Sequence, residues 1–68
     1  MNINSEEVFS FIEQTHSSIQ WSPINKEWGI ITKFGIYTDK SLERAIKKAV
    51  NMFNFHMKAD GLLSAWSI

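Results

Sequence analysis

The stretch TDKSLERAIKKAVNMFNFHM, from Thr38 to Met57, decides the fold. Its apolar residues recur at the three-to-four spacing of one helix face, namely Leu42, Ala45, Ile46, Ala49, Val50, Phe53 and Met57. This spacing predicts an amphipathic helix over about residues 39–60, capped by Thr38 or Asp39. Gly61 is expected to end it in a left-handed conformation, with Leu62 folded back onto the last turn. Such a helix must pack its apolar stripe against another element.

Short upstream segments rich in Ile, Trp, Phe, Tyr and Thr supply that element. Residues 19–22 alternate apolar and polar side chains as a half-buried strand does, and Pro23 stops the pattern. Residues 24–26 supply turn chemistry, and Glu27 to Thr32 has the composition of a second strand. We therefore expect two antiparallel strands here.

A third strand is expected around Gly35, which interrupts an otherwise continuous strand-like run with a tight turn or a bulge. In this strand the pleat would place Phe34, Ile36 and Thr38 on one side and Tyr37 on the other. The strand would lead directly into the helix that follows.

The first residues predict another helix, over about residues 4–16. Asn4 can cap it, Glu7 occupies the third helical position, and Ile3 and Val8 can form a hydrophobic staple. Its apolar face is formed by Val8, Phe11, Ile12 and Thr15, with Phe9 at the shoulder. The predicted fold is therefore α+β: a small three-stranded antiparallel sheet packed against two helices, in the order α-β-β-β-α, followed by a short C-terminal tail.

Composition narrows the class of protein. The 68 residues are 44% hydrophobic, which is enough for one ordered domain over residues 1–68. The chain has no Cys, which excludes disulfides, thiolate zinc sites and cysteine nucleophiles. Its acidic start lacks the basic and then apolar pattern of a secretion signal, and no apolar run is long enough to span a bilayer. We expect a cytoplasmic protein.

Catalytic and metal-binding patterns are missing from the sequence. His16 and His56 are the only histidines, and apart from Asp60, four residues after His56, no metal-ligand spacing accompanies them. No serine lies in a G-x-S-x-G context, and three glycines cannot form a phosphate-binding loop. We expect no enzyme activity, no metal and no cofactor.

Charge is distributed unevenly along the chain, although the net charge is zero. Residues 1–32 carry four glutamates and one lysine, a net charge of −3. Residues 33–68 carry six basic and three acidic residues, a net charge of +3. The two halves can attract each other, or they can present an acidic and a basic patch to partners.

The exposed side of the second helix is the candidate partner surface, together with the apolar tail. The predicted contact residues are Arg44, Lys47, Lys48, Asn51, Phe55, Lys58 and Trp66. One hypothesis is that they bind a protein partner. The alternative is that the basic residues bind DNA or RNA, with an exposed strand aromatic stacking on bases. The tail LLSAWSI can fold back over the sheet or helix, or it can form an edge strand or patch that mediates self-association.

Three resemblances bear on these hypotheses. The run GIYTDKSLERAIKKA, residues 35–49, resembles the strand-to-helix passage of HicB-like antitoxins, where Thr or Ser and then Leu-Glu-x-Ala open the helix. The element order is similar to that of double-stranded-RNA-binding domains, and Lys40, Arg44, Lys47 and Lys48 fall near that family's basic residues. A compact cysteine-free domain is also similar in kind to phage and mobile-element accessory proteins such as anti-CRISPR proteins. This last resemblance implies an inhibitor of a host complex.

Overall fold

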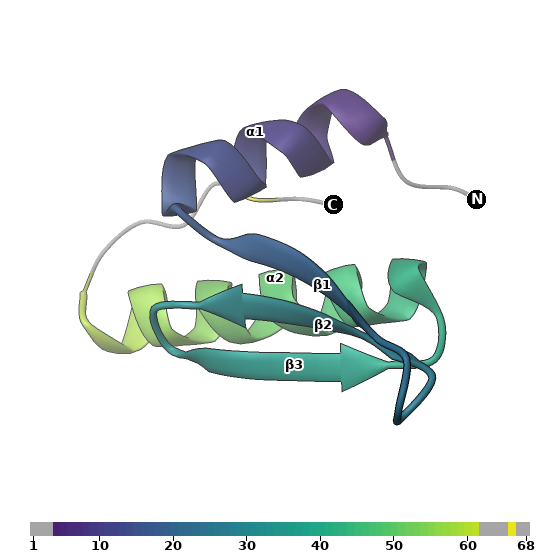
Figure 1. The fold of residues 1–68 in the computed structure, drawn as a ribbon. Helices are drawn as coiled ribbons and strands as arrows, with labels where there is room; N and C mark the ends of the chain where they lie inside the picture. The colour runs from purple at the N-terminus through teal and green to yellow at the C-terminus, as the bar shows by residue number, and fades with distance from the viewer. Residues whose placement is uncertain (1–3, 62–65, 67–68) are drawn as a thin grey trace.

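The computed structural model describes residues 4–61 and Trp66, and it has the predicted α+β architecture. Its elements are α1 (Ser5–Thr15), β1 (Ser18–Ser22), β2 (Glu27–Thr32), β3 (Gly35–Asp39) and α2 (Leu42–Ala59). The strands form one antiparallel sheet in the order β1-β2-β3. In Figure 1, α2 runs behind this sheet and α1 crosses above it, while the front of the sheet carries no helix.

The strand register divides the sheet into two faces. Ile19, Ile30 and Tyr37 are paired across the three strands and form an apolar row on the helix side. Because successive side chains alternate, the residues between them point to the opposite side. We call this side the open face; it carries Ser18, Gln20, Ser22, Glu27, Gly29, Ile31, Ile36 and Thr38.

The hydrophobic core lies between the sheet and the two helices. Its buried members are Val8, Phe11, Ile30, Ala45, Ile46, Ala49, Val50 and Phe53, with Leu42 and Met57 packed against them. The predicted apolar stripe of the second helix is therefore confirmed. Phe11 joins α1 to α2, because its ring meets the Phe53 ring edge-on with centroids 5.5 Å apart. Such aromatic pairs stabilise a core beyond the area that they bury.

The helix starts are partly as predicted. The Asn4 side chain caps α1 by accepting hydrogen bonds from the N–H groups of Glu6 and Glu7. The prediction that Thr38 or Asp39 caps α2 is wrong, since Ser41 is the cap and its hydroxyl accepts from the Arg44 N–H. Asp39 belongs to β3, where it pairs with Trp28, so the helix begins later.

The C-terminal end of α2 is as predicted, whereas the start of β3 is not. Gly61 has the expected positive φ of 78°, and Leu62 lies outside the described residues. The prediction that Phe34 and Ile36 share one side of the pleat is wrong, because Phe34 lies in the turn before β3. The Thr32 hydroxyl accepts from the Phe34 N–H and donates to the Gly35 carbonyl, which tightens this turn. Because Phe34 lies in the turn, the alternation of the strand does not set the direction of its side chain. Its ring packs on the Phe53 ring, with centroids 5.0 Å apart.

His16 ends α1 in a left-handed conformation, with φ 55° and ψ 37°. The Ser17 N–H bonds to the Ile12 carbonyl across it, at 2.9 Å, as in a Schellman motif. A side chain at this position strains the backbone, whereas glycine does not. We expect His16→Gly to raise the free energy of unfolding by about 0.5–1 kcal/mol, measured by urea denaturation. Glu13→Gly, in the helix itself, should lower it by about 1 kcal/mol. Equal losses in both variants would contradict this interpretation of His16.

Candidate interaction surfaces

The outward side of α2 carries most of the predicted contact residues. Arg44, Lys48, Asn51, Phe55 and Lys58 follow one another at helical spacing and are all exposed, and Lys47 lies exposed beside them. We call these six residues the outer stripe. The Phe55 side chain is 63% exposed. The outer stripe is thus a basic surface with one aromatic side chain near its C-terminal end.

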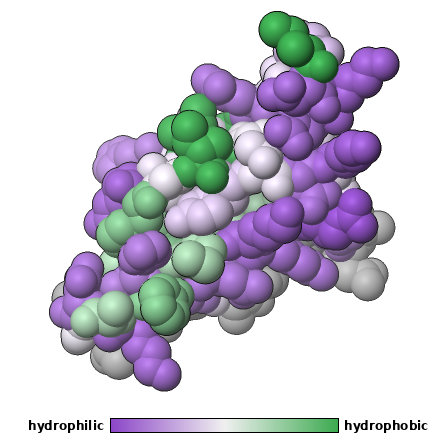
Figure 2. All heavy atoms as spheres, turned by 90° about the horizontal axis from the view of Figure 1, so that it is seen from below, coloured by the Kyte–Doolittle hydropathy of each residue, from purple (hydrophilic) through white to green (hydrophobic). Residues whose placement is uncertain are grey.

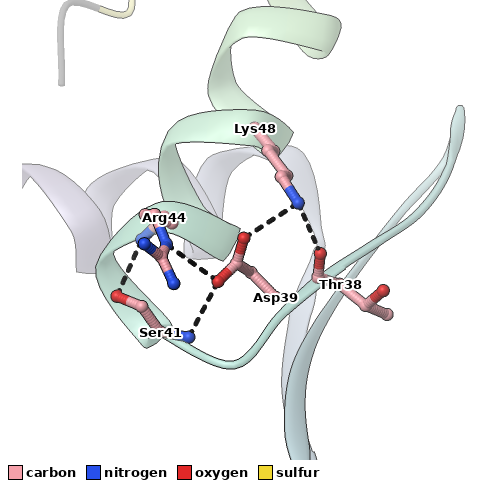
Figure 3. A network of polar contacts seen from close by, with 5 residues as sticks. All are labelled: Thr38, Asp39, Ser41, Arg44 and Lys48. Atoms are coloured by element: carbon pink, nitrogen blue, oxygen red, sulfur yellow. Dashed lines mark hydrogen bonds and ion pairs between the residues drawn. The ribbon is translucent and has the colours of Figure 1, made fainter.

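Asp39, at the end of β3, engages two cations of the outer stripe (Figure 3). The Arg44 Nε lies 3.0 Å from Asp39 Oδ1, and the Lys48 Nζ lies 2.9 Å from Oδ2. The Ser41 N–H also donates to Oδ1, and Lys48 donates a second hydrogen bond to the Thr38 carbonyl. Lys47 is 4.0 Å from Glu43. The positive charge near the start of α2 is therefore partly offset within the molecule, by two carboxylates.

The same contacts determine the protonation of Asp39. Hydrogen bonds from the Ser41 N–H and the Lys48 ammonium, followed by the Arg44 guanidinium, hold the pKa of the Asp39 carboxyl well below its usual range. Burial acts in the opposite direction but does not outweigh them. The carboxylate therefore ties β3 to the first turns of α2 as long as it is ionised.

A pH-dependent contribution to stability follows. A lowered pKa in the folded state means that the contribution is complete above the ordinary aspartate pKa of about 4 and decreases as the pH falls below it. We expect Asp39→Asn to lower the melting temperature at pH 7, and the difference from wild type to shrink below about pH 4. Asp60→Asn, at the other end of α2, is the control and should not lose stability at pH 7. A difference in melting temperature between Asp39→Asn and wild type that stays constant down to pH 2 would contradict the ionic role of Asp39.

Trp66 lies apart from the outer stripe. It is half-buried, and its ring meets the Phe11 ring edge-on with centroids 5.3 Å apart. Its carbonyl accepts a hydrogen bond of 2.7 Å from the Asn54 side-chain amide. The structure thus places this predicted contact residue against the core. Residues 62–65 and 67–68, on which the rest of the tail prediction depends, lie outside the described residues.

The open face contains a hollow that sequence reasoning missed. Its volume is about 380 Å³, and its floor is Gly29, in the middle of the central strand. Gly29 pairs with Gln20 on one side and Thr38 on the other, and Ile31 and Ile36 form the apolar wall. The absence of a side chain at Gly29 leaves the space between these neighbours unfilled. The available signal was a lone glycine inside the strand-like run from Glu27 to Thr32.

The fold does not require glycine at this position. Gly29 has no positive φ, in contrast to Gly35 and Gly61. An added Cβ would meet Thr38 Cγ2 at 3.7 Å and Ile36 Cγ2 at 3.8 Å, which are ordinary van der Waals distances. Glycine inside a strand lowers stability by about 0.5–1 kcal/mol relative to alanine. The hollow therefore has a cost that no local backbone or packing constraint explains.

Exposed apolar side chains occur beside the hollow and elsewhere. Ile36 is 63% exposed, and Trp21 is 48% exposed with its ring 5.1 Å from that of Trp28. Ile24 is almost fully exposed at the tip of the β1–β2 turn. Seen from below the view of Figure 1, hydrophobic side chains form separate patches on a largely hydrophilic face (Figure 2).

The described residues contain no group of His, Asp and Glu side chains suited to hold a metal ion. His56 stacks on the Phe34 ring with centroids 4.6 Å apart, which is a packing role. None of the helices in the described part of the chain is long and apolar enough to cross a membrane. Comparison of the chain with protein-family models, with curated proteins and with solved structures finds no match, so a function has to be argued from these surfaces.

Proposed function

We propose that the chain is a non-catalytic binding protein that contacts a protein partner through the open face of its sheet. The observation that carries this proposal is the hollow over Gly29, which costs stability and is not needed for the fold. Strand glycines of this kind allow another molecule to approach the backbone closely. Like small inhibitors of phages and mobile elements, such a domain would regulate a larger host complex by occluding part of it.

The chemistry of the hollow suits a protein partner. Ile31 and Ile36 make an apolar wall on one side of the hollow, and Gln20 and Thr38 beside Gly29 are polar, so the hollow offers both kinds of contact that protein interfaces use. Among the described residues that line the hollow, Glu27 alone is charged. The volume lies at the lower end of the range of about 300–1,000 Å³ for ligand pockets, and the hollow is open to solvent. An apolar side chain protruding from a partner could enter it.

Nucleic-acid binding by the outer stripe is the second candidate function. It is favoured by the alignment of Lys48, Asn51, Phe55 and Lys58 on one exposed helix side, with an aromatic ring available for stacking. It is weakened by the contacts of Asp39 with Arg44 and Lys48. Binding of this kind would fall steeply with salt and would be lost in a Lys47→Glu/Lys48→Glu variant.

The test uses a substitution that places a side chain on the floor of the hollow without harming the fold. Gly29→Thr adds a β-branched side chain where a Cβ has room, so its stability should equal or exceed that of wild type by up to about 1 kcal/mol. Ser18→Thr is the control, because it introduces a threonine on the open face outside the lining of the hollow. Both variants, wild type and Lys47→Glu/Lys48→Glu are used to capture partners from host lysate, half of which is treated with nuclease.

We expect wild type and Ser18→Thr to retain the same protein and Gly29→Thr to lose it. The purified partner should then bind Gly29→Thr at least about tenfold more weakly, which corresponds to 1.4 kcal/mol. Equal binding by all three proteins would refute the open-face site. Recovery of material that disappears after nuclease treatment and in the Lys47→Glu/Lys48→Glu variant would favour the nucleic-acid alternative.

A further inference from the structure

We propose that the group that enters the hollow is an arginine side chain of the protein partner, with its guanidinium at Glu27 and its aliphatic stem over Gly29. This inference rests on the proposed function, because it concerns the same site on the open face. It deepens that function by naming the chemistry that a partner must present, whereas the proposed function asks only for a close approach to the strand.

The hollow has two unlike ends along β2. Gly29 lies between Ile31 and Glu27 on the open face, about 7 Å along the strand from each, because every second residue points to the same side. Ile31 pairs with Ile36 of β3, so this end is apolar. Glu27 pairs with Ser22 of β1, so the other end is polar and carries a negative charge. The floor at Gly29 thus leads from an apolar wall to a carboxylate.

The carboxylate of Glu27 is available to a cation from outside. Glu27 is half-buried, and in the part of the chain that the structure describes it forms no ion pair. Lys26, which precedes it, and Lys40, which follows β3, are both exposed and do not engage it. Asp39 differs, because Arg44 and Lys48 already bind its two oxygens. Of these two carboxylates, only Glu27 lines a hollow and can accept a new cationic partner.

An arginine side chain has the arrangement of groups that the hollow requires. Its stem packs on apolar surface while its charged head stays at the polar end. A guanidinium binds a carboxylate through two parallel hydrogen bonds and has further N–H donors. Gln20 and Asn25 also line the hollow, and their side-chain oxygens can accept from those donors. Lysine presents a compact charge that matches such a planar set of acceptors less well. A purely apolar side chain would leave Glu27 unpaired.

Short peptides test this chemistry directly on the full chain. The probes are blocked pentapeptides with arginine, citrulline or leucine between four glycines; citrulline has the shape of arginine without its charge. Binding to the isotope-labelled protein is followed through the amide chemical shifts of Gln20, Gly29 and Thr38. Glu27→Gln removes the charge and keeps the shape of the side chain. Glu13→Gln is the matched control, since it removes an exposed carboxylate from α1, outside the lining of the hollow.

We expect the arginine peptide to shift the three amides and to saturate with a Kd in the millimolar range. The citrulline and leucine peptides should bind at least about threefold more weakly, because they cannot pair with Glu27. Glu27→Gln should weaken the arginine peptide by the same factor, and Glu13→Gln should not. Equal binding of arginine and citrulline, or of the arginine peptide by wild type and Glu27→Gln, would overturn the inference. The absence of shifts at these amides up to about 20 mM peptide would overturn it as well.

Failure of the inference and failure of the proposed function give different results with the captured protein. A partner that is lost by Gly29→Thr but bound by Glu27→Gln with wild-type affinity would retain the open-face site and refute the arginine. A partner that Gly29→Thr binds as wild type does would refute the open-face site, and the inference would fall with it. Weaker binding by both variants, with Glu13→Gln unaffected, is the result that we expect.

Discussion

Phe53→Ala should destabilise the protein by about 3–5 kcal/mol, the usual cost of deleting a buried aromatic ring. The Phe53 ring contacts Phe11 of α1 and Phe34 of the β2–β3 turn, and the Lys33 ammonium lies 5.6 Å from its centroid. Removing it opens a cavity where three parts of the chain meet. A domain of 68 residues has a total stability of only about 3–10 kcal/mol, so much of the population would be unfolded at 37 °C.

The control for this prediction lies two residues further along the same helix. Phe55→Ala removes the same ring from an exposed position and should change stability by no more than about 0.5 kcal/mol. Chemical denaturation followed by far-ultraviolet circular dichroism measures both variants. Similar losses in the two variants would show that burial does not distinguish the two rings.

Trp66→Ala should cost about 2 kcal/mol, less than Phe53→Ala because Trp66 is only half-buried. The lost interactions are the edge-on contact with Phe11 and part of the cover over that buried ring. A double-mutant cycle with Phe11→Leu should give a coupling free energy of about 0.5–1.5 kcal/mol. The cycle isolates this contact from any general effect on the tail.

The outcome also decides how Trp66 can be used as a probe. Unchanged stability with zero coupling to Phe11 would mean that Trp66 does not pack on α1, and would restore it as a candidate contact residue. A loss of stability would mean that weaker partner binding by Trp66→Ala cannot be assigned to the interface. For this reason Gly29→Thr, which leaves the core intact, is the sharper variant for binding experiments.

Periodicity predicted the helices and the sheet well. The stripe that ends at Phe53 and Met57 recurs over more than four turns, so its face could be assigned without knowing its partners. The cap of α2 could not be assigned in the same way. Thr38, Asp39 and Ser41 all have side chains that cap helices, and only the pairing of Asp39 with Trp28 leaves Ser41 to do so.

The surfaces were predictable to different degrees. The outer stripe is the complement of the apolar stripe, so its exposure followed from the helix prediction. The contacts of Arg44 and Lys48 with Asp39 depend on how β3 turns into α2, which helix periodicity does not describe. The hollow over Gly29 depends on Gln20 and Thr38 being its cross-strand neighbours and on the helices lying on the other face. Neither the contacts of Asp39 nor the hollow can be predicted without the register of the sheet.

The connections of the sheet also affect how the chain folds. Each strand pairs with the next along the sequence, through turns of four and two residues, so both hairpins form by closing short loops. Short loops lower the entropic barrier, and sheets built from them fold faster than those with distant pairings. The contact of Phe11 with Phe53 instead joins residues 42 positions apart. The sheet and α2 can therefore assemble first, and the docking of α1 completes the native state.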